Sequence, residues 1–101
     1  MEDEDLQIRE AVARFLTESE GNTQEGWDGL RPNFNINGSL ITSQIHSLDG
    51  HKKMSRGEEF RVSIDLPTGR LEGVTDYLKI GAEFTLQGGS KVYAKGRIIK
   101  V

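Results

Sequence analysis

The sequence predicts a small all-β protein, an antiparallel barrel or sandwich. Polar and apolar residues alternate without error from Glu59 to Leu66, and Gly88 and Gly89 separate two further alternating segments. A period of two is typical of a strand with one buried face, and a two-residue glycine link is typical of a tight hairpin. Several short strands in 101 residues, with turn signals between them, therefore favour a barrel or a sandwich.

Length and composition indicate one soluble domain. The chain has no cysteine and two histidines, so burial of apolar side chains must stabilise it in place of disulfides or a thiolate zinc site. Hydrophobic residues make up 35% and fall in ordered patterns, which argues against disorder. No run approaches the length of about 18 apolar residues that a membrane span needs, and residues 1–5 lack the pattern of a signal peptide. We expect a cytoplasmic protein without membrane contact.

The first segment, residues 6–17, is ambiguous when taken alone. Its apolar positions fit an amphipathic helix, which is the favoured interpretation from the pattern by itself. Ala11, Ala13 and Phe15 also alternate with Val12, as they would in a strand. Intrinsic helix propensity is a weak guide, so the segment stays open at this point.

The middle of the chain is extended but irregular. From Phe34 to Ile45 the apolar parity slips around residues 37–39, Asn-Gly-Ser, which predicts a glycine bulge or bend. Residues 59–66 form the clearest strand. Residues 18–29 and 66–74 are polar or contain glycine and proline, so both are expected to be loops.

The last two strands, residues 84–87 and 91–100, are expected to pair as a hairpin through Gly88 and Gly89. One side of the final strand carries Val92, Ala94, Gly96 and Ile98, and the other carries Lys91, Tyr93, Lys95 and Arg97. The expected core comprises Val12, Phe34, Ile36, Phe60, Val62, Ile64, Leu66, Ile80, Phe84, Leu86, Val92 and Ile98.

Charge is distributed unevenly along the chain. Residues 1–30 hold nine acidic and two basic side chains, a balance of −7, whereas residues 31–101 hold seven acidic and eleven basic ones, a balance of +4. The net charge of −3 therefore conceals two parts that would present different faces to a partner.

Three motifs follow one another in a characteristic order. Residues 29–34 read Gly-Leu-Arg-Pro-Asn-Phe, residues 55–60 read Ser-Arg-Gly-Glu-Glu-Phe, and residues 81–96 form a glycine-bounded hairpin segment. They resemble the Gly-Tyr-Arg-Pro-Gln-Phe signature, the Met-Pro-Gly-Asp-x-Ile turn and the closing Gly-x-Arg-Phe-x-Ile-Arg-Glu-Gly-x-Arg/Lys-x-Val-Gly-x-Gly segment of the C-terminal (third) domain of elongation factor Tu. The resemblance covers about residues 8–101.

This resemblance implies a fold and limits the chemistry. It implies a six-stranded antiparallel Greek-key barrel over residues 8–101, after an acidic N-terminal segment of residues 1–7, and it makes residues 12–16 part of the first strand. The sequence contains no Gly-x-x-x-x-Gly-Lys-Ser/Thr phosphate loop, which excludes GTP hydrolysis by these residues. No nucleophile, metal or cofactor motif stands out, so we expect neither an enzyme nor a cofactor.

The resemblance also implies partners in translation. In the family this domain helps to hold the T-stem of aminoacyl-tRNA, packs on the GTPase domain and meets the nucleotide-exchange factor. Arg31 and Lys91 match basic residues of the family, and Asn33 replaces its glutamine with a shorter amide. The Arg-His-Thr-Pro-Phe loop of the family, however, falls on residues 22–26, Asn-Thr-Gln-Glu-Gly, and the glutamate of its turn falls on Gly88. We therefore expect tRNA to bind at most weakly, with a dissociation constant above about 10 μM.

Basic residues of the final strand form the first candidate partner site. Lys91, Lys95 and Arg97 lie beside Tyr93, which favours a phosphate-facing surface, although basic side chains also serve simply to protect an edge strand. Lys100 extends the series.

A loop tryptophan and two histidines complete the set of candidate residues. Trp27 is either an interface anchor or a lid over one end of the barrel. His46 and His51 flank a turn next to Asp49, but two histidines without a third strong ligand make a poor metal site. We expect no bound metal.

Three functions fit these features. The leading hypothesis is a binding module that contacts protein or RNA in translation, with Arg31, Asn33, Lys91, Lys95, Arg97 and Trp27 as its contact residues. The alternative is a regulatory or protective decoy of the elongation-factor domain. A third hypothesis is an accessory domain with a separately encoded GTPase partner. The sequence leaves the oligomeric state open.

Overall fold

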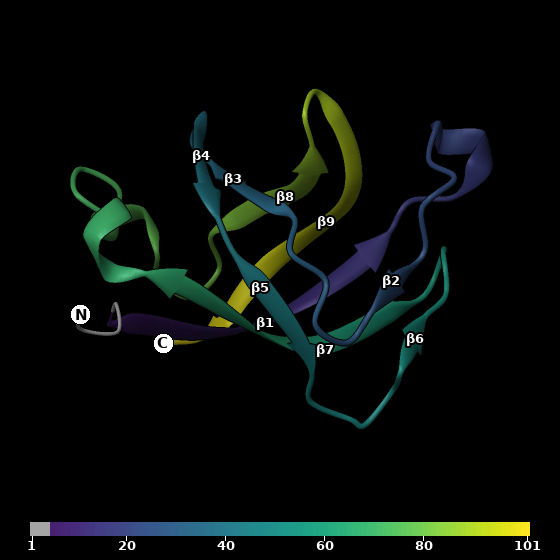
Figure 1. Cartoon of the computed structure of the whole chain (residues 1–101), viewed down its shortest axis with the longest axis horizontal. Helices are drawn as coiled ribbons and strands as arrows, with labels where there is room; N and C mark the ends of the chain where they lie inside the picture. The colour runs from purple at the N-terminus through teal and green to yellow at the C-terminus, as the bar shows by residue number, and fades with distance from the viewer. Residues whose placement is uncertain (1–4) are drawn as a thin grey trace.

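The computed structural model describes residues 5–101, in which antiparallel β-strands are the main regular structure (Figure 1). Their strands are β1 (Leu6–Phe15), β2 (Gly26–Trp27), β3 (Asn33–Ile36), β4 (Ser39–Thr42), β5 (Gln44–Ser47), β6 (Lys53–Met54), β7 (Glu59–Pro67), β8 (Glu83–Gly88) and β9 (Lys91–Lys100). Short 3₁₀ turns occur at η1 (Glu18–Glu20), η2 (Thr68–Arg70) and η3 (Thr75–Tyr77). The prediction of an all-β protein is confirmed. Within these residues, no helix has the length and apolar character needed to cross a membrane.

Seven strands form one curled antiparallel sheet in the order β4-β3-β8-β9-β1-β7-β5. The two ends of this order, β4 and β5, are consecutive in the chain and are separated by Ser43 alone. Ser43 is buried, and its hydroxyl donates a 2.7 Å hydrogen bond to the carbonyl of Pro32 at the bend. Counted as one bent strand, β4 and β5 join the two edges of the sheet, which gives the predicted six-stranded barrel.

The first segment is a strand, as the family resemblance implies. The helix favoured by the apolar pattern of residues 6–17 alone was therefore wrong. β1 lies between β7 and β9 and pairs with both over most of its length. Ala11, Ala13 and Phe15 face the core, whereas Val12 lies opposite Arg61 and Arg97 on the outer face. The prediction that Val12 belongs to the core was therefore wrong, because the buried face of the strand carries the odd-numbered residues on either side of it. β1 begins at Leu6, inside the predicted acidic segment, and residues 1–4 of that segment lie outside the described residues.

The irregularity after Phe34 is a hairpin rather than a bulge. Phe34 pairs with Ile41, and Ile36 pairs with Ser39, so residues 37–38 form a two-residue turn. Asn37 has a φ of 52° and Gly38 a φ of 84°. An Asn-Gly pair with both φ angles positive suits the turn that matches the twist of a hairpin, and this turn reverses the chain and resets the parity.

The hairpin between β8 and β9 is displaced by one residue from its predicted place. Gly88 pairs with Lys91, so the loop consists of Gly89 and Ser90. A register shift after Leu86 leaves Tyr93 as an extra residue in β9, and its side chain packs against the core over Gly88. Tyr93 therefore does not share the outer face with the basic residues, and Val92 is only partly buried.

The core also departs from prediction at one end of the barrel. Ile80, expected inside, is 65% exposed. Leu71, Val74 and Leu78, from the long segment between β7 and β8, pack into the core in its place. The segment lacks strand periodicity, so its buried positions could not be identified from alternation. The other buried apolar residues that the sequence analysis did not select are Ala11, Ala13, Phe15, Leu16, Leu30, Ile41, Ile45, Met54 and Ala94.

Truncation of a buried side chain in β7, which lies between β1 and β5, tests this assignment of the core. Ile64 is fully buried, so Ile64→Ala is expected to lower the free energy of unfolding by about 2–4 kcal/mol. Ile80→Ala is the matched control and is expected to cost less than about 0.5 kcal/mol, because its side chain is exposed. Urea unfolding of both variants measures the difference. Similar losses in the two would contradict the burial described here.

Candidate functional site

One row of polar side chains crosses five strands on the outer face of the barrel. Asn35 of β3 is paired with Thr85 of β8, and Thr85 is paired with Lys95 of β9. Lys95 is in turn paired with Arg14 of β1, which is paired with Glu59 of β7. Directly paired residues of antiparallel strands hold their Cβ atoms about 5 Å apart, so these five side chains form a continuous ladder.

This row forms part of an open groove of about 560 Å³. The neighbouring row contributes Glu83 and Arg97, which are paired across β8 and β9, and Asn37 lies at the adjoining hairpin turn. The groove is lined by Val12, Arg14, Asn35, Asn37, Glu59, Glu83, Phe84, Thr85, Lys95, Gly96 and Arg97. The groove thus combines amide and hydroxyl groups with charges of both signs.

Two of the three cations in the groove are close to carboxylates. The Arg14 guanidinium donates two hydrogen bonds to Glu20, of 3.0 and 2.8 Å. A guanidinium nitrogen of Arg97 lies 3.7 Å from a carboxylate oxygen of Glu59. Within residues 5–101, Lys95 has no carboxylate within 4.0 Å. Lys95 is therefore the cation of the groove that is free for a ligand.

The hydrogen bonds from Arg14, together with those from the Thr17 backbone and hydroxyl, lower the pKa of Glu20 to about 2 from its usual 4.5. Because the folded state has the lower pKa, the ionised carboxylate stabilises it fully above about pH 4.5, and this contribution is lost as the pH falls to about 2. We expect Glu20→Gln to lower the melting temperature at pH 7. The difference from the wild type should vanish near pH 2. A difference that persisted there would contradict the ion pair as its cause.

Gln87 organises one wall of the groove. Its side-chain oxygen accepts hydrogen bonds from Asn35 and from Thr85, each 3.0 Å long. Its amide nitrogen donates a 2.9 Å bond to the carbonyl of Gly89 in the hairpin loop. Gln87 is only 8% exposed although it has the outward parity of its strand. Sequence analysis missed it because alternation assigns an outward glutamine to solvent.

Gln87→Ala is expected to cost about 1–3 kcal/mol of unfolding free energy, since Asn35, Thr85 and Gly89 would each lose a hydrogen-bond partner. Amide exchange should become faster in the β8–β9 hairpin. Ser90→Ala, at an exposed position of the same hairpin, serves as the control and should change stability by less than about 0.5 kcal/mol. Equal losses of stability in Gln87→Ala and Ser90→Ala would show that the hydrogen bonds of Gln87 do not stabilise the protein.

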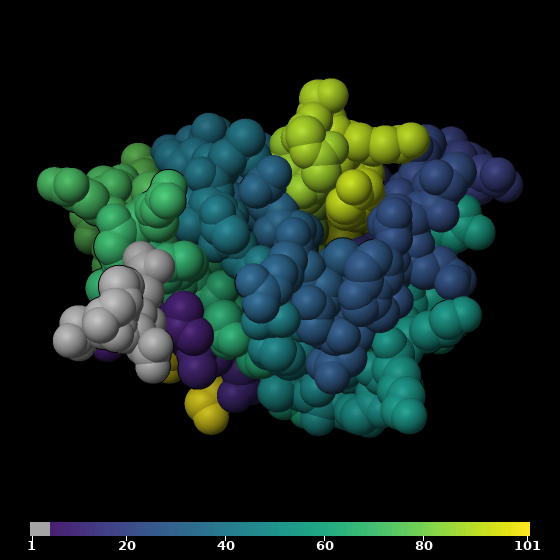
Figure 2. Space-filling model, in the orientation of Figure 1, coloured from purple at the N-terminus to yellow at the C-terminus, as the bar shows by residue number. Residues whose placement is uncertain are grey.

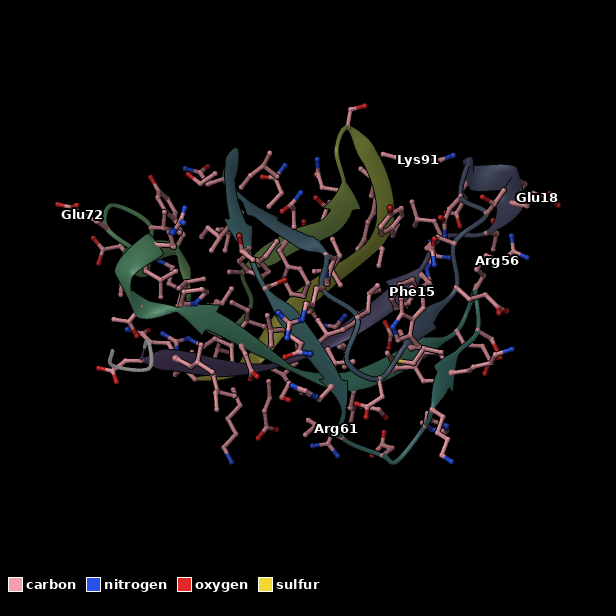
Figure 3. The ribbon with its side chains drawn as sticks, in the orientation of Figure 1. Phe15, Glu18, Arg56, Arg61, Glu72 and Lys91 are labelled. Atoms are coloured by element: carbon pink, nitrogen blue, oxygen red, sulfur yellow. The ribbon has the colours of Figure 1, made fainter. Side chains whose placement is uncertain are left out.

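The structure gathers only some of the predicted contact residues. Lys95 and Arg97 line the groove, and Asn33 lies one row away, paired with Gln87. Lys91 extends from the tip of the β8–β9 hairpin (Figure 3). Arg31 is exposed in the loop before β3.

Trp27 is separate from this set and lines a second pocket on the β2–β6 ribbon. Of the six predicted contact residues, two therefore line the groove, one lines the second pocket and three line neither. The sequence could not show this division, because strand pairing determines which residues meet.

Lys100 and the two histidines, which the sequence analysis also considered, have local partners. The Lys100 ammonium lies 3.9 Å from a carboxylate oxygen of Glu10. His46 places its Nε2 atom 3.1 Å from Asp65 and its Nδ1 atom 3.7 Å from Asp28. The ring of His51 packs edge-on against Phe60. Across the part of the chain that the structure describes, no group of three histidine or acidic residues could hold a metal ion.

Comparison with known proteins adds no relative to this description. No protein-family model matches the chain, and a search of curated proteins gave no match.

Proposed function

We propose that the chain is a non-catalytic binding module, similar to the C-terminal domain of elongation factor Tu, that contacts a protein of the translation machinery through the groove. The observation that carries this proposal is the polar row across β3, β8, β9, β1 and β7. Lys95 lies at its centre among amide and hydroxyl groups. The three sequence motifs supply the link to translation.

The charges of the groove favour a protein over an RNA backbone. Arg14 and Arg97 are partly neutralised by Glu20 and Glu59, and Glu83 adds a further negative charge. A chain of phosphates would meet carboxylates along this surface, whereas a protein surface can offer both charges and hydrogen-bonding groups. This is the reason for placing a protein in the groove.

Affinity capture with charge-reversal variants tests the proposal. The tagged protein is incubated with an RNase-treated cell lysate, and the bound proteins are identified and quantified. We expect translation proteins to be enriched by the wild type and reduced about tenfold by Lys95→Glu, since a central cation of the contact is reversed. Lys79→Glu is the matched control, because Lys79 is exposed and lies outside the groove, and it should retain capture.

Three outcomes would contradict the proposal. Capture from an untreated lysate but not from the RNase-treated one would indicate an RNA contact. Equal losses in Lys95→Glu and Lys79→Glu would exclude the groove. An absence of translation proteins would remove the link to translation. Filter binding gives a further check, because the proposal requires tRNA to bind more weakly than about 10 μM near physiological salt.

A further inference from the structure

The β2–β6 ribbon carries a second surface that the groove does not include. Gly26 is paired with Met54, and Trp27 is paired with Lys53. Met54 is fully buried, and a Cβ atom on Gly26 would lie 2.4 Å from the ring of Phe15. The ribbon is therefore fixed to the barrel by the face that bears Gly26 and Met54. Its other face presents Trp27 and Lys53.

An open pocket of about 440 Å³ lies along this ribbon. We call it the Trp27 pocket; it is lined by Thr23, Gln24, Glu25, Gly26, Trp27, Lys53 and Arg56. Figure 3 shows Arg56 on the side of the barrel where β2 and β6 lie, and Figure 2 shows this end of the molecule as a surface. Trp27 is 44% exposed, so a large apolar ring is available in a polar pocket.

The Trp27 pocket contains two cations, Lys53 and Arg56. Arg56 donates one hydrogen bond of 3.1 Å to the carbonyl of Asn22, which holds its guanidinium in place. Among residues 5–101, neither Lys53 nor Arg56 has a carboxylate within 4.0 Å. Two free cations beside an exposed indole suit a ligand that combines negative charges with an apolar group.

An acidic peptide satisfies this combination better than a nucleic acid does. Glu25 lines the pocket, so a continuous phosphate chain would pass a carboxylate. A peptide can place separate carboxylates on the cations and an apolar side chain between them. The Trp27 and Glu25 carbonyls already accept hydrogen bonds from the Leu30 backbone and the Gln24 side chain, so the peptide is recognised through its side chains.

We infer that the Trp27 pocket binds an acidic, extended peptide segment of a partner protein. An apolar side chain of the peptide packs on the Trp27 indole. Its carboxylates pair with Lys53 and Arg56. The groove and the Trp27 pocket share no lining residue, so the protein would have two separate contact surfaces.

Fluorescence of the protein reports directly on this pocket, because Trp27 is the only tryptophan in the chain. The probe is an acetylated and amidated peptide of sequence Gly-Glu-Ser-Leu-Ser-Glu-Gly, which places both glutamates and the leucine on one face when extended, titrated to about 1 mM, a range that detects weak binding. We expect a blue shift of the emission, since a leucine would exclude water from the indole. The same peptide with glutamine in place of each glutamate is expected to bind at least about tenfold more weakly.

Charge variants locate the peptide. Lys53→Gln and Arg56→Gln should each weaken binding at least about threefold, whereas Lys79→Gln, at an exposed position outside both the groove and the Trp27 pocket, should leave it unchanged. The inference is overturned if the acidic peptide leaves the emission unchanged up to 1 mM, if the glutamine peptide binds equally well, or if Lys53→Gln has no effect. A shift caused by an oligouridylate but not by the peptide would assign the pocket to nucleic acid and would likewise overturn it.

Discussion

Asn22→Ala is expected to lower the free energy of unfolding by about 3–5 kcal/mol, because the fully buried side chain holds several backbone groups together. The Asn22 amide nitrogen donates to the carbonyls of Leu16 and Gln24, at 2.8 Å each, and to that of Tyr93, at 3.2 Å. Its oxygen accepts from the Gln24 backbone at 2.8 Å. Alanine would remove all of these bonds, and only the Tyr93 carbonyl would keep a further bond, the 2.8 Å one from the Leu16 backbone N–H. Such a loss is a large part of the stability of a small domain.

Two further variants separate this role from a general sensitivity of the loop. Thr23→Ala alters the exposed neighbour and should change stability by less than about 0.5 kcal/mol. Asn22→Asp retains an acceptor but removes the donor that faces three carbonyls, so it should destabilise the protein at least as much as alanine at neutral pH. Urea unfolding measures all three variants. A stable Asn22→Asp protein would contradict the donor role.

Gly96→Ala is expected to lower the free energy of unfolding by about 3 kcal/mol or more, or to prevent folding. A Cβ atom at this position would lie 2.4 Å from the backbone oxygen of Val12 and 2.6 Å from the ring of Phe84. The backbone oxygen belongs to the adjacent strand β1, so relief requires β1 and β9 to separate. Loss of the cooperative thermal transition, or a much lower melting temperature, would show the effect.

Gly21→Ala provides the comparison for Gly96→Ala. Gly21 has a φ of 91° but no atom within 4 Å of an added Cβ, so this variant measures backbone strain without crowding. Its expected cost is about 1–2 kcal/mol. If both variants lost the same stability, crowding between β1 and β9 would not be the reason for glycine at position 96.

Strand alternation was sufficient to predict an antiparallel all-β protein, but it did not identify the strand at residues 6–17 or the pairing of the strands. The pattern of residues 59–66 corresponds to β7, and the glycines after Leu86 correspond to a hairpin displaced by one residue. Which side chains meet, however, depends on register shifts near Leu86 and between Glu10 and Ala11. Such shifts insert a residue without a sequence signal of their own. Lys95 and Arg97 could therefore be selected from the sequence as candidate contact residues, but the side chains that lie beside them in the groove could not.

Buried polar residues are the other part that the sequence did not disclose. Asn22 and Gln87 have polar side chains in a loop and on an outward strand face, where solvent exposure is the usual expectation. Both are buried because backbone carbonyls or neighbouring side chains require their amide groups. Tertiary contacts of this kind become visible only when strands distant in the chain have been placed side by side.

The central position of β1 has a consequence for how the chain acquires its structure. β1 is synthesised before its partners β7 and β9, and Phe15 pairs with Ala94, which is 79 residues further along the chain. Contacts between such distant residues are slow to form, which favours folding on a timescale of about milliseconds to seconds rather than microseconds. During translation the edge of β1 that pairs with β9 stays unpaired until β9 has left the ribosome. The domain should then fold in a single late step rather than strand by strand.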